Sequence, residues 1–308
     1  MRIVVHGQQA FGKSVLEALA ERGEDVVAVY CAPDPAGGRI DPLKEAALAR
    51  KLPVYQPRSF RKDPAVREEF ARLEADLCVM AYVTLIVPGE ILNLPARGTI
   101  QYHPSLLPRH RGPSSINWPI IQGEMRTGLS IFWPDDGLDT GPILLQREVE
   151  IRDTDTLGSL YFDRLYPLGV SALLEGVDLV RAGRAPRIAQ DESQATYEGW
   201  CRKEHVEVDW GKPLQEIWNL IRGADPQPGA WTTHGGTVVQ LLDAKKVPGD
   251  PGGRPGEVAA VDDAGVSIAA AGGRIQVGRV RADGGAKVGA AEFARSAGLR
   301  PGTRLGRA

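Results

Sequence analysis

His103 and Asp139 are the two side chains of this sequence whose positions suggest proton exchange. The β-branched and aromatic run from Thr99 to Tyr102 predicts a strand that places His103 at its carboxyl end, where open α/β sheets bind ligands. A second predicted strand, Thr127 to Trp133, leads into an acidic turn that can carry Asp139 back to His103. We therefore expect an imidazole and a carboxylate on two neighbouring strand ends. Histidine exchanges protons near neutral pH, so this pair suits general acid–base chemistry.

The other polar groups near this pair are expected to have structural roles. Ser105 lies in a proline-containing loop without the glycine pattern of a nucleophile elbow, so it should bond to backbone and not attack carbon. Asp135 and Asp136 are expected to be turn residues. Arg109 and Arg111 could bind an anionic group or simply be solvated. The remaining histidines are expected to be ordinary surface or packed residues: His6, His110, His205 and His234.

The first half of the chain predicts an α/β fold with a mostly parallel, Rossmann-like sheet. Arg2 to His6 is a run of consecutive apolar residues typical of a buried parallel strand. Phe11 to Arg22 has apolar residues at helical spacing, and Asp25 to Tyr30 is the next strand, which together make a βαβ unit. Asp76 to Tyr82 is apolar on both faces and predicts a central strand. The glycines after the first strand lack the three-glycine spacing of a dinucleotide site.

The second half predicts a long helix and then a small separate domain. Apolar residues recur at helical intervals from Thr156 to Ala182. An amphipathic helix is expected over Pro213 to Ile221. From Trp231 onward, short valine- and isoleucine-rich segments alternate with glycine turns, a pattern typical of a small β-barrel resembling the OB-fold. We expect a catalytic domain over residues 1–190, a linker over 191–210 and the barrel domain over 211–308.

Composition places few limits on partners. Charged residues make up 25% of the 308 residues and the net charge is −2, so the totals indicate neither nucleic acid nor membrane binding. The cysteines Cys31, Cys78 and Cys201 form neither a metal-type spacing nor a disulfide framework. We expect a cytoplasmic protein without a metal. The first residues lack signal-peptide features, and no run reaches the roughly 18 apolar residues of a membrane span.

Four short motifs resemble one protein family. They read HPSLLPRHRG from His103, LDTGPI from Leu138, ATYEG from Ala195 and PGAW from Pro228. Together they are similar to the folate-dependent formyltransferases, a family that includes methionyl-tRNA formyltransferase and the hydrolase domain of 10-formyltetrahydrofolate dehydrogenase. The closing segment from Gly272 to Leu299 resembles the small C-terminal domain of that family. The resemblance covers nearly the whole chain.

This resemblance implies a co-substrate and a set of site residues. The formyl donor would be 10-formyltetrahydrofolate, and His103 and Asp139 would be catalytic. Gln101 stands where the family usually has a third catalytic residue, asparagine; its amide can still donate a hydrogen bond, displaced by about one bond length. The implied folate contacts are Leu85, Ile86, Val87, Pro88, Ser105, Leu106, Leu107, Asp136 and Leu138. For the first four of these, a plain connection between strand and helix is an equally good interpretation.

The acceptor of the formyl group has three interpretations. An amine, either methionyl-tRNA or a small metabolite, is our first hypothesis. From Gly211 onward there are 13 Lys and Arg against 9 Asp and Glu, which mildly supports tRNA. However, the loop from Ala32 to Lys44 lacks the lysine-rich insertion of tRNA-formylating relatives. Water is the second hypothesis and would make the protein a 10-formyltetrahydrofolate hydrolase. A catalytically silent folate-binding module is the third, against which the presence of both His103 and Asp139 argues.

Overall fold

The computed structural model describes residues 1–306 as two compact units. The first unit combines residues 1–112, 128–149 and 162–197, and the second combines residues 113–127, 150–161 and the chain from Glu198 onward. The chain therefore passes between the two units several times. One of the basic residues counted near the end of the chain, Arg307, lies outside the described residues.

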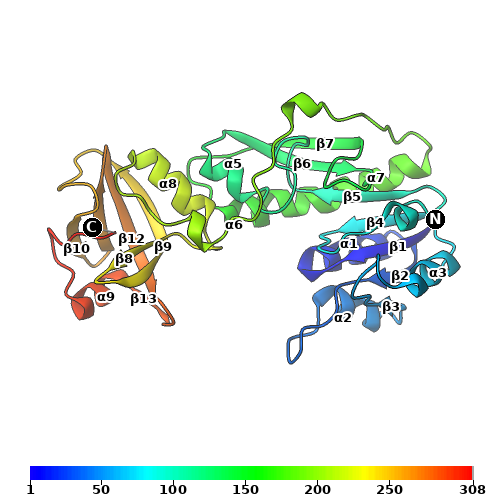
Figure 1. The fold of residues 1–308 in the computed structure, drawn as a ribbon, viewed down its shortest axis with the longest axis horizontal. Coiled ribbons are helices and arrows are strands. Elements are labelled where there is room, and N and C mark those ends of the chain that lie inside the picture. Colours follow the sequence, from blue (N-terminus) through cyan, green and yellow to red (C-terminus); the bar gives the residue numbers. More distant parts are fainter. Residues whose placement is uncertain (307–308) are drawn as a thin grey trace. The chain divides into compact units, whose positions relative to one another are not determined.

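The first unit is built on a mostly parallel sheet, as predicted (Figure 1). Within residues 1–306 this sheet has seven strands in the order β3-β2-β1-β4-β5-β6-β7. Their bounds are β1 Arg2–Gly7, β2 Asp25–Tyr30, β3 Val54–Tyr55, β4 Leu77–Ala81, β5 Thr99–His103, β6 Arg126–Phe132 and β7 Ile143–Glu150. The pairings from β3 across to β5 are parallel, whereas β5 and β6 are antiparallel. The predicted βαβ unit, β1-α1-β2, is present.

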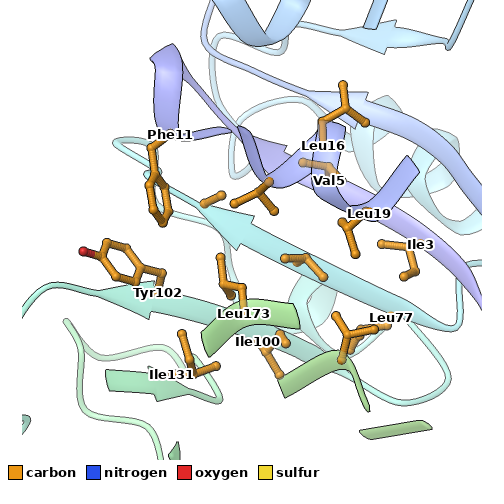
Figure 2. Close-up of a cluster of buried hydrophobic side chains, with 14 of the residues drawn as sticks. Ile3, Val5, Phe11, Leu16, Leu19, Leu77, Ile100, Tyr102, Ile131 and Leu173 are labelled. Atoms are coloured by element: carbon orange, nitrogen blue, oxygen red, sulfur yellow. The ribbon is translucent and has the colours of Figure 1, made fainter. Parts of the chain in front are cut away.

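Helices cover both faces of this sheet because its strands are apolar on both sides. Alternate residues of a strand point to opposite faces, so Ile3 and Val5 join one core while Val4 joins the other. The first core includes α1 (Gln9–Glu21), α2 (Pro42–Ala49) and α7 (Tyr166–Arg181), and Figure 2 shows Leu16 of α1 and Leu173 of α7 in it. The second core includes α3 (Pro64–Arg72) and α4 (Gly89–Leu92).

The long helix predicted over Thr156 to Ala182 is not continuous. It begins as α6 (Leu157–Leu160), passes through one π-helical segment over Tyr161–Leu165 and continues as α7. Pro167 is the second residue of α7 and has no backbone N–H. The regular i to i−4 hydrogen bonding cannot pass through it unchanged, which accounts for the irregular turn just before it.

The second unit contains an antiparallel, barrel-like sheet, in agreement with the predicted fold class. Within the described residues it has six strands, in the order β10-β11-β12-β9-β8 with β13 paired to β12. The bounds are β8 Trp231–His234, β9 Thr237–Pro248, β10 Val258–Asp262, β11 Gly265–Ala270, β12 Gly273–Ala282 and β13 Lys287–Gly289. Helices α5 (Asn117–Ile121) and α8 (Leu214–Gly223) belong to the same unit. Helix α9 (Ala290–Ala297) was missed by the sequence reading because its buried residues, Ala290 and Ala294, are small.

Between residues 1 and 306, every helix is too short or too polar to cross a lipid bilayer.

The three cysteines are buried free thiols: Cys31, Cys78 and Cys201.

His6 is a buried histidine at the carboxyl half of β1. Its ring lies against Phe60, with centroids 5.0 Å apart, and near Tyr30 at 6.3 Å. This burial lowers the pKa of His6 to about 3. The sequence reading of His6 as a packed residue agrees with this position.

A neutral His6 makes the stability of the protein depend on pH. The unfolded chain protonates this histidine below about pH 6.5, whereas the folded protein keeps it neutral. The free energy of unfolding therefore decreases as the pH falls from about 6.5 toward 3. We predict that His6→Leu flattens this loss, which should reach roughly 1.4 kcal/mol per pH unit below about pH 6. Urea unfolding between pH 7 and pH 5 measures it. His205→Leu, which changes an exposed histidine, is the control. The prediction would be contradicted if the free energy of unfolding of His6→Leu and of the wild type depended on pH in the same way.

Candidate active site

His103 ends β5, and the pairing of β5 with β6 determines how a carboxylate reaches it. In the antiparallel register His103 lies opposite Ser130, and Gln101 lies opposite Phe132. The carboxyl ends of the two strands therefore do not coincide, and the prediction of two neighbouring strand ends was wrong in this respect. The turn after β6 has to fold back along β5 to bring Asp139 to His103.

The turn does fold back, and the imidazole and carboxylate meet. Nδ1 of His103 lies 3.5 Å from Oδ2 of Asp139. The two ends of the turn are tied by a hydrogen bond of 2.9 Å from the Trp133 N–H to the Pro142 carbonyl. Gly141 permits this closure, because a Cβ at that position would lie 1.8 Å from the Trp133 carbonyl oxygen. The close approach of the Trp133 carbonyl therefore explains why the LDTGPI motif has glycine at this position.

Asp139 is buried, and its carboxylate is held by a backbone hydrogen bond. It is 8% exposed and has a φ of 55°, in the left-handed region that residues other than glycine seldom adopt. The N–H of Gly112 donates to Oδ2 of Asp139 at 2.8 Å. A buried carboxylate needs such partners, because removing it from water is costly. The last residue of the HPSLLPRHRG motif is therefore a direct partner of the aspartate.

Both ring nitrogens of His103 face protein groups, and the ring is 6% exposed. Nε2 lies 2.8 Å from the carbonyl oxygen of His110. A carbonyl only accepts hydrogen bonds, so Nε2 must carry the hydrogen in this contact. The opposite nitrogen then faces the carboxylate of Asp139, and when it too is protonated the ring is an imidazolium paired with Asp139. The imidazole therefore lies between a carbonyl oxygen on one side and a carboxylate on the other.

The loop that follows His103 is fixed by side chains of β6 and β7. The hydroxyl of Ser130 accepts from the Leu107 N–H at 3.1 Å and donates to the Ser105 carbonyl at 2.7 Å. The amide of Gln146 donates to the Leu107 carbonyl at 2.9 Å. Ser105 donates its own hydroxyl to the Arg109 carbonyl at 2.6 Å, the backbone role expected of it. The sequence reading missed Ser130 and Gln146, although a serine within the apolar strand LSIF was an available signal.

Arg111 is neither a solvated arginine nor open to a ligand. It is 9% exposed, and its guanidinium donates to both carboxylate oxygens of Glu192, at 2.9 and 2.6 Å. The hydrogen bond to Glu192 is the main cause that raises the pKa of Arg111 above its usual value. Arg109, in contrast, is exposed.

Gln101 and His103 are two residues apart on β5, so their side chains lie on the same face of the sheet. Gln101 is partly exposed, whereas the intervening Tyr102 is buried and points the other way into the first core (Figure 2). The amide of Gln101 therefore lies on the face of the sheet that also carries the imidazole of His103.

The residues expected to contact folate differ in their exposure to solvent. Oδ1 of Asp136 accepts from the Gly89 N–H at 2.8 Å, so the acidic turn is tied to the end of the segment from Leu85 to Pro88. Ile86 and Leu138 are 63% and 51% exposed. Val87 and Leu107, by contrast, are buried in apolar clusters. The remaining members, Leu85, Pro88 and Leu106, are partly exposed, and Ser105 is buried.

Within residues 1–306, no group of three or more His, Cys, Asp or Glu side chains is arranged to hold a metal ion.

Comparison with known proteins gives a family for both halves of the chain. A model described as formyl transferase matches residues 1–177, and one described as formyl transferase, C-terminal domain, matches residues 201–298. The solved structure of HypX from Aquifex aeolicus in complex with tetrahydrofolic acid has a TM-score of 0.70 at 21% identity, over 96% of this chain and 47% of that one. The sugar 3N-formyl transferase WlaRD has a TM-score of 0.69 at 18% identity, over 90% and 97%. At these identities the likeness concerns the fold.

Two relatives are much more similar in sequence. Human mitochondrial 10-formyltetrahydrofolate dehydrogenase is 42% identical over 260 residues, which is 82% of this chain and 28% of that protein. The chain thus spans less than a third of the dehydrogenases that it matches. Methionyl-tRNA formyltransferase of Syntrophus aciditrophicus is 38% identical over 309 residues, 99% of this chain and 98% of that one. The chain therefore belongs to the formyl transferase family, as its motifs implied.

Proposed function

We propose that this protein transfers the formyl group of 10-formyltetrahydrofolate to an amine, with His103 and Asp139 as the catalytic pair. The observation that carries the proposal is the contact of 3.5 Å between these two buried groups at the end of β5. The match to a methionyl-tRNA formyltransferase over 99% of this chain and 98% of that one supports a transferase, because it includes the C-terminal domain. That relative also makes charged tRNA one candidate for the amine.

The proposed reaction comprises three changes. The amine nitrogen bonds to the formyl carbon, the bond from that carbon to N10 of the folate breaks, and a proton moves from the amine to N10. Asp139 accepts the amine proton, and the Nε2 hydrogen of His103 binds the oxyanion and then passes to N10 as the bond from the formyl carbon to N10 breaks. The proton on Asp139 then passes to Nδ1 of His103, so the imidazole is again neutral and the carboxylate is again ionised. Because the N–H at Nε2 of His103 donates to the His110 carbonyl, this hydrogen bond must be exchanged for one to the formyl oxygen. Gln101, on the same face of β5, supplies a second donor to that oxygen.

Hydrolysis of 10-formyltetrahydrofolate is the second candidate. The observation in its favour is the higher identity to the dehydrogenases, 42% against 38% for the methionyl-tRNA formyltransferase. Under this alternative, water takes the place of the amine and the products are formate and tetrahydrofolate. The same two residues serve, because water also loses a proton as it attacks.

We predict that His103→Asn and Asp139→Asn each lower turnover by about a hundredfold or more, since each removes a proton-transferring or charge-stabilising group. Binding of tetrahydrofolate, followed by calorimetry, should change little because the fold is retained. His205→Asn, which alters an exposed histidine, is the control and should keep the wild-type rate. Unchanged turnover in either site variant would remove that residue from the mechanism.

We predict that tetrahydrofolate is released from 10-formyltetrahydrofolate only when an amine acceptor is supplied. The measurement compares release in buffer alone, with small primary amines and with charged initiator methionyl-tRNA. Rapid release in buffer alone would reverse the order of the two candidates. If the tRNA is the acceptor, its binding should weaken steeply with salt because phosphate contacts release counterions.

A further inference from the structure

We propose that Gln190 is a positioning residue for Asp139, fixing the backbone of the acidic turn so that the carboxylate faces His103. The inference rests on the proposed function only for its kinetic test. Its basis is a set of hydrogen bonds that links the turn to the loop containing His103.

Gln190 uses both ends of its side-chain amide. Its Nε2 donates to the carbonyl oxygens of Asp139, at 2.8 Å, and of Gly141, at 2.7 Å. Its Oε1 accepts from the guanidinium of Arg111, at 3.1 Å from Nε and 2.8 Å from Nη2. Both hydrogens of the NH₂ group are thus used, and the arginine determines which way round the amide lies.

The result is that one short segment holds Asp139 at two places. The Gly112 N–H binds the carboxylate of Asp139, and the neighbouring Arg111 side chain holds the Asp139 carbonyl through Gln190. With both its carbonyl and its carboxylate fixed, the residue has no freedom to turn its side chain away from His103. Gln190 itself is partly buried, so its hydrogen bonds are shielded from competition with water.

Asp139 needs such a restraint because of its backbone conformation. A φ of 55° lies in the left-handed region, which aspartate enters more readily than most residues with a side chain but which still costs free energy, so contacts to the turn help to hold it there. If the turn relaxed, the Asp139 carboxylate would swing away from Nδ1 of His103, now 3.5 Å away. Positioning to within about half an ångström is the usual requirement for a catalytic pair.

Glutamine is the residue type that this place requires. The position must donate two hydrogen bonds to carbonyls and accept from an arginine at the same time, which only an amide does. A methionine has a similar length and no charge but neither donor nor strong acceptor. An asparagine keeps the amide on a side chain one methylene shorter. Glu192 offers a matched control, because it accepts from the same Arg111 guanidinium, whereas Gln190 joins that guanidinium to the carbonyls of Asp139 and Gly141.

The test compares Gln190→Met and Gln190→Asn with Glu192→Gln in the full-length protein. We expect kcat to fall by about tenfold or more in Gln190→Met, with KM for 10-formyltetrahydrofolate within about twofold of wild type. Gln190→Asn should lose less, and Glu192→Gln should stay within about twofold for both constants. A kcat loss shared equally by Glu192→Gln would instead show a general structural effect and overturn the proposal.

A second readout needs no turnover. The ring-nitrogen resonances of His103 in ¹⁵N-labelled protein report its protonation and its contact with Asp139. We expect them to move in Gln190→Met and to stay in place in Glu192→Gln. Wild-type resonances and wild-type kcat in Gln190→Met would overturn the positioning role. If the wild-type protein failed to use 10-formyltetrahydrofolate, the proposed function would fail while the resonances still decided the role of Gln190.

Discussion

The candidate site depends on one interaction, the closure of the turn after β6 back onto the end of β5. Because β5 and β6 are antiparallel, the chain leaves β6 opposite Gln101 and moving away from His103. Only a turn that reverses at once can bring a carboxylate back. Gly141 has no Cβ to obstruct the reversal, and the Gly112 N–H donates a hydrogen bond to the Asp139 carboxylate. The proposed catalytic pair is therefore a product of a loop contact and not of the sheet alone.

Burial makes this contact matter for both stability and chemistry. A buried carboxylate without partners is costly, so Asp139 gains from the Gly112 N–H and from the imidazole of His103 beside it. The same burial strengthens the electrostatic interaction between the imidazole and the carboxylate. A substrate oxygen that took over the Nε2 hydrogen bond now made to His110 would enter a site whose charges are already oriented. Such preorganisation is the main way in which enzymes stabilise developing charge.

The sequence predicted the framework well because its signals are local. Consecutive apolar residues in β1 and β4 identified buried parallel strands, and glycine-separated short strands identified the barrel-like sheet. The sequence predicted that His103 and Asp139 lie close together, but it placed them wrongly at neighbouring strand ends. The direction in which β6 pairs with β5 has no signal in the local sequence. Ser130, Gln146 and Gln190 act on residues far away in the chain, and no periodicity indicates such contacts. The π-helical turn before Pro167 was missed because periodicity alone does not weigh a missing N–H.

The geometry of the pair is compatible with more than one acceptor. An amine and a water molecule both present a lone pair to the formyl carbon and both lose a proton, so His103 and Asp139 suit either. In the proposed mechanism Gln101 binds the formyl oxygen, so its longer amide changes how the oxyanion is held and not which nucleophile attacks. Selection of the acceptor must therefore come from groups that bind the remainder of an amine substrate, which water does not have. The identity of the acceptor therefore depends on the groups that bind it, whereas the proposed acid–base chemistry depends on the turn that carries Asp139.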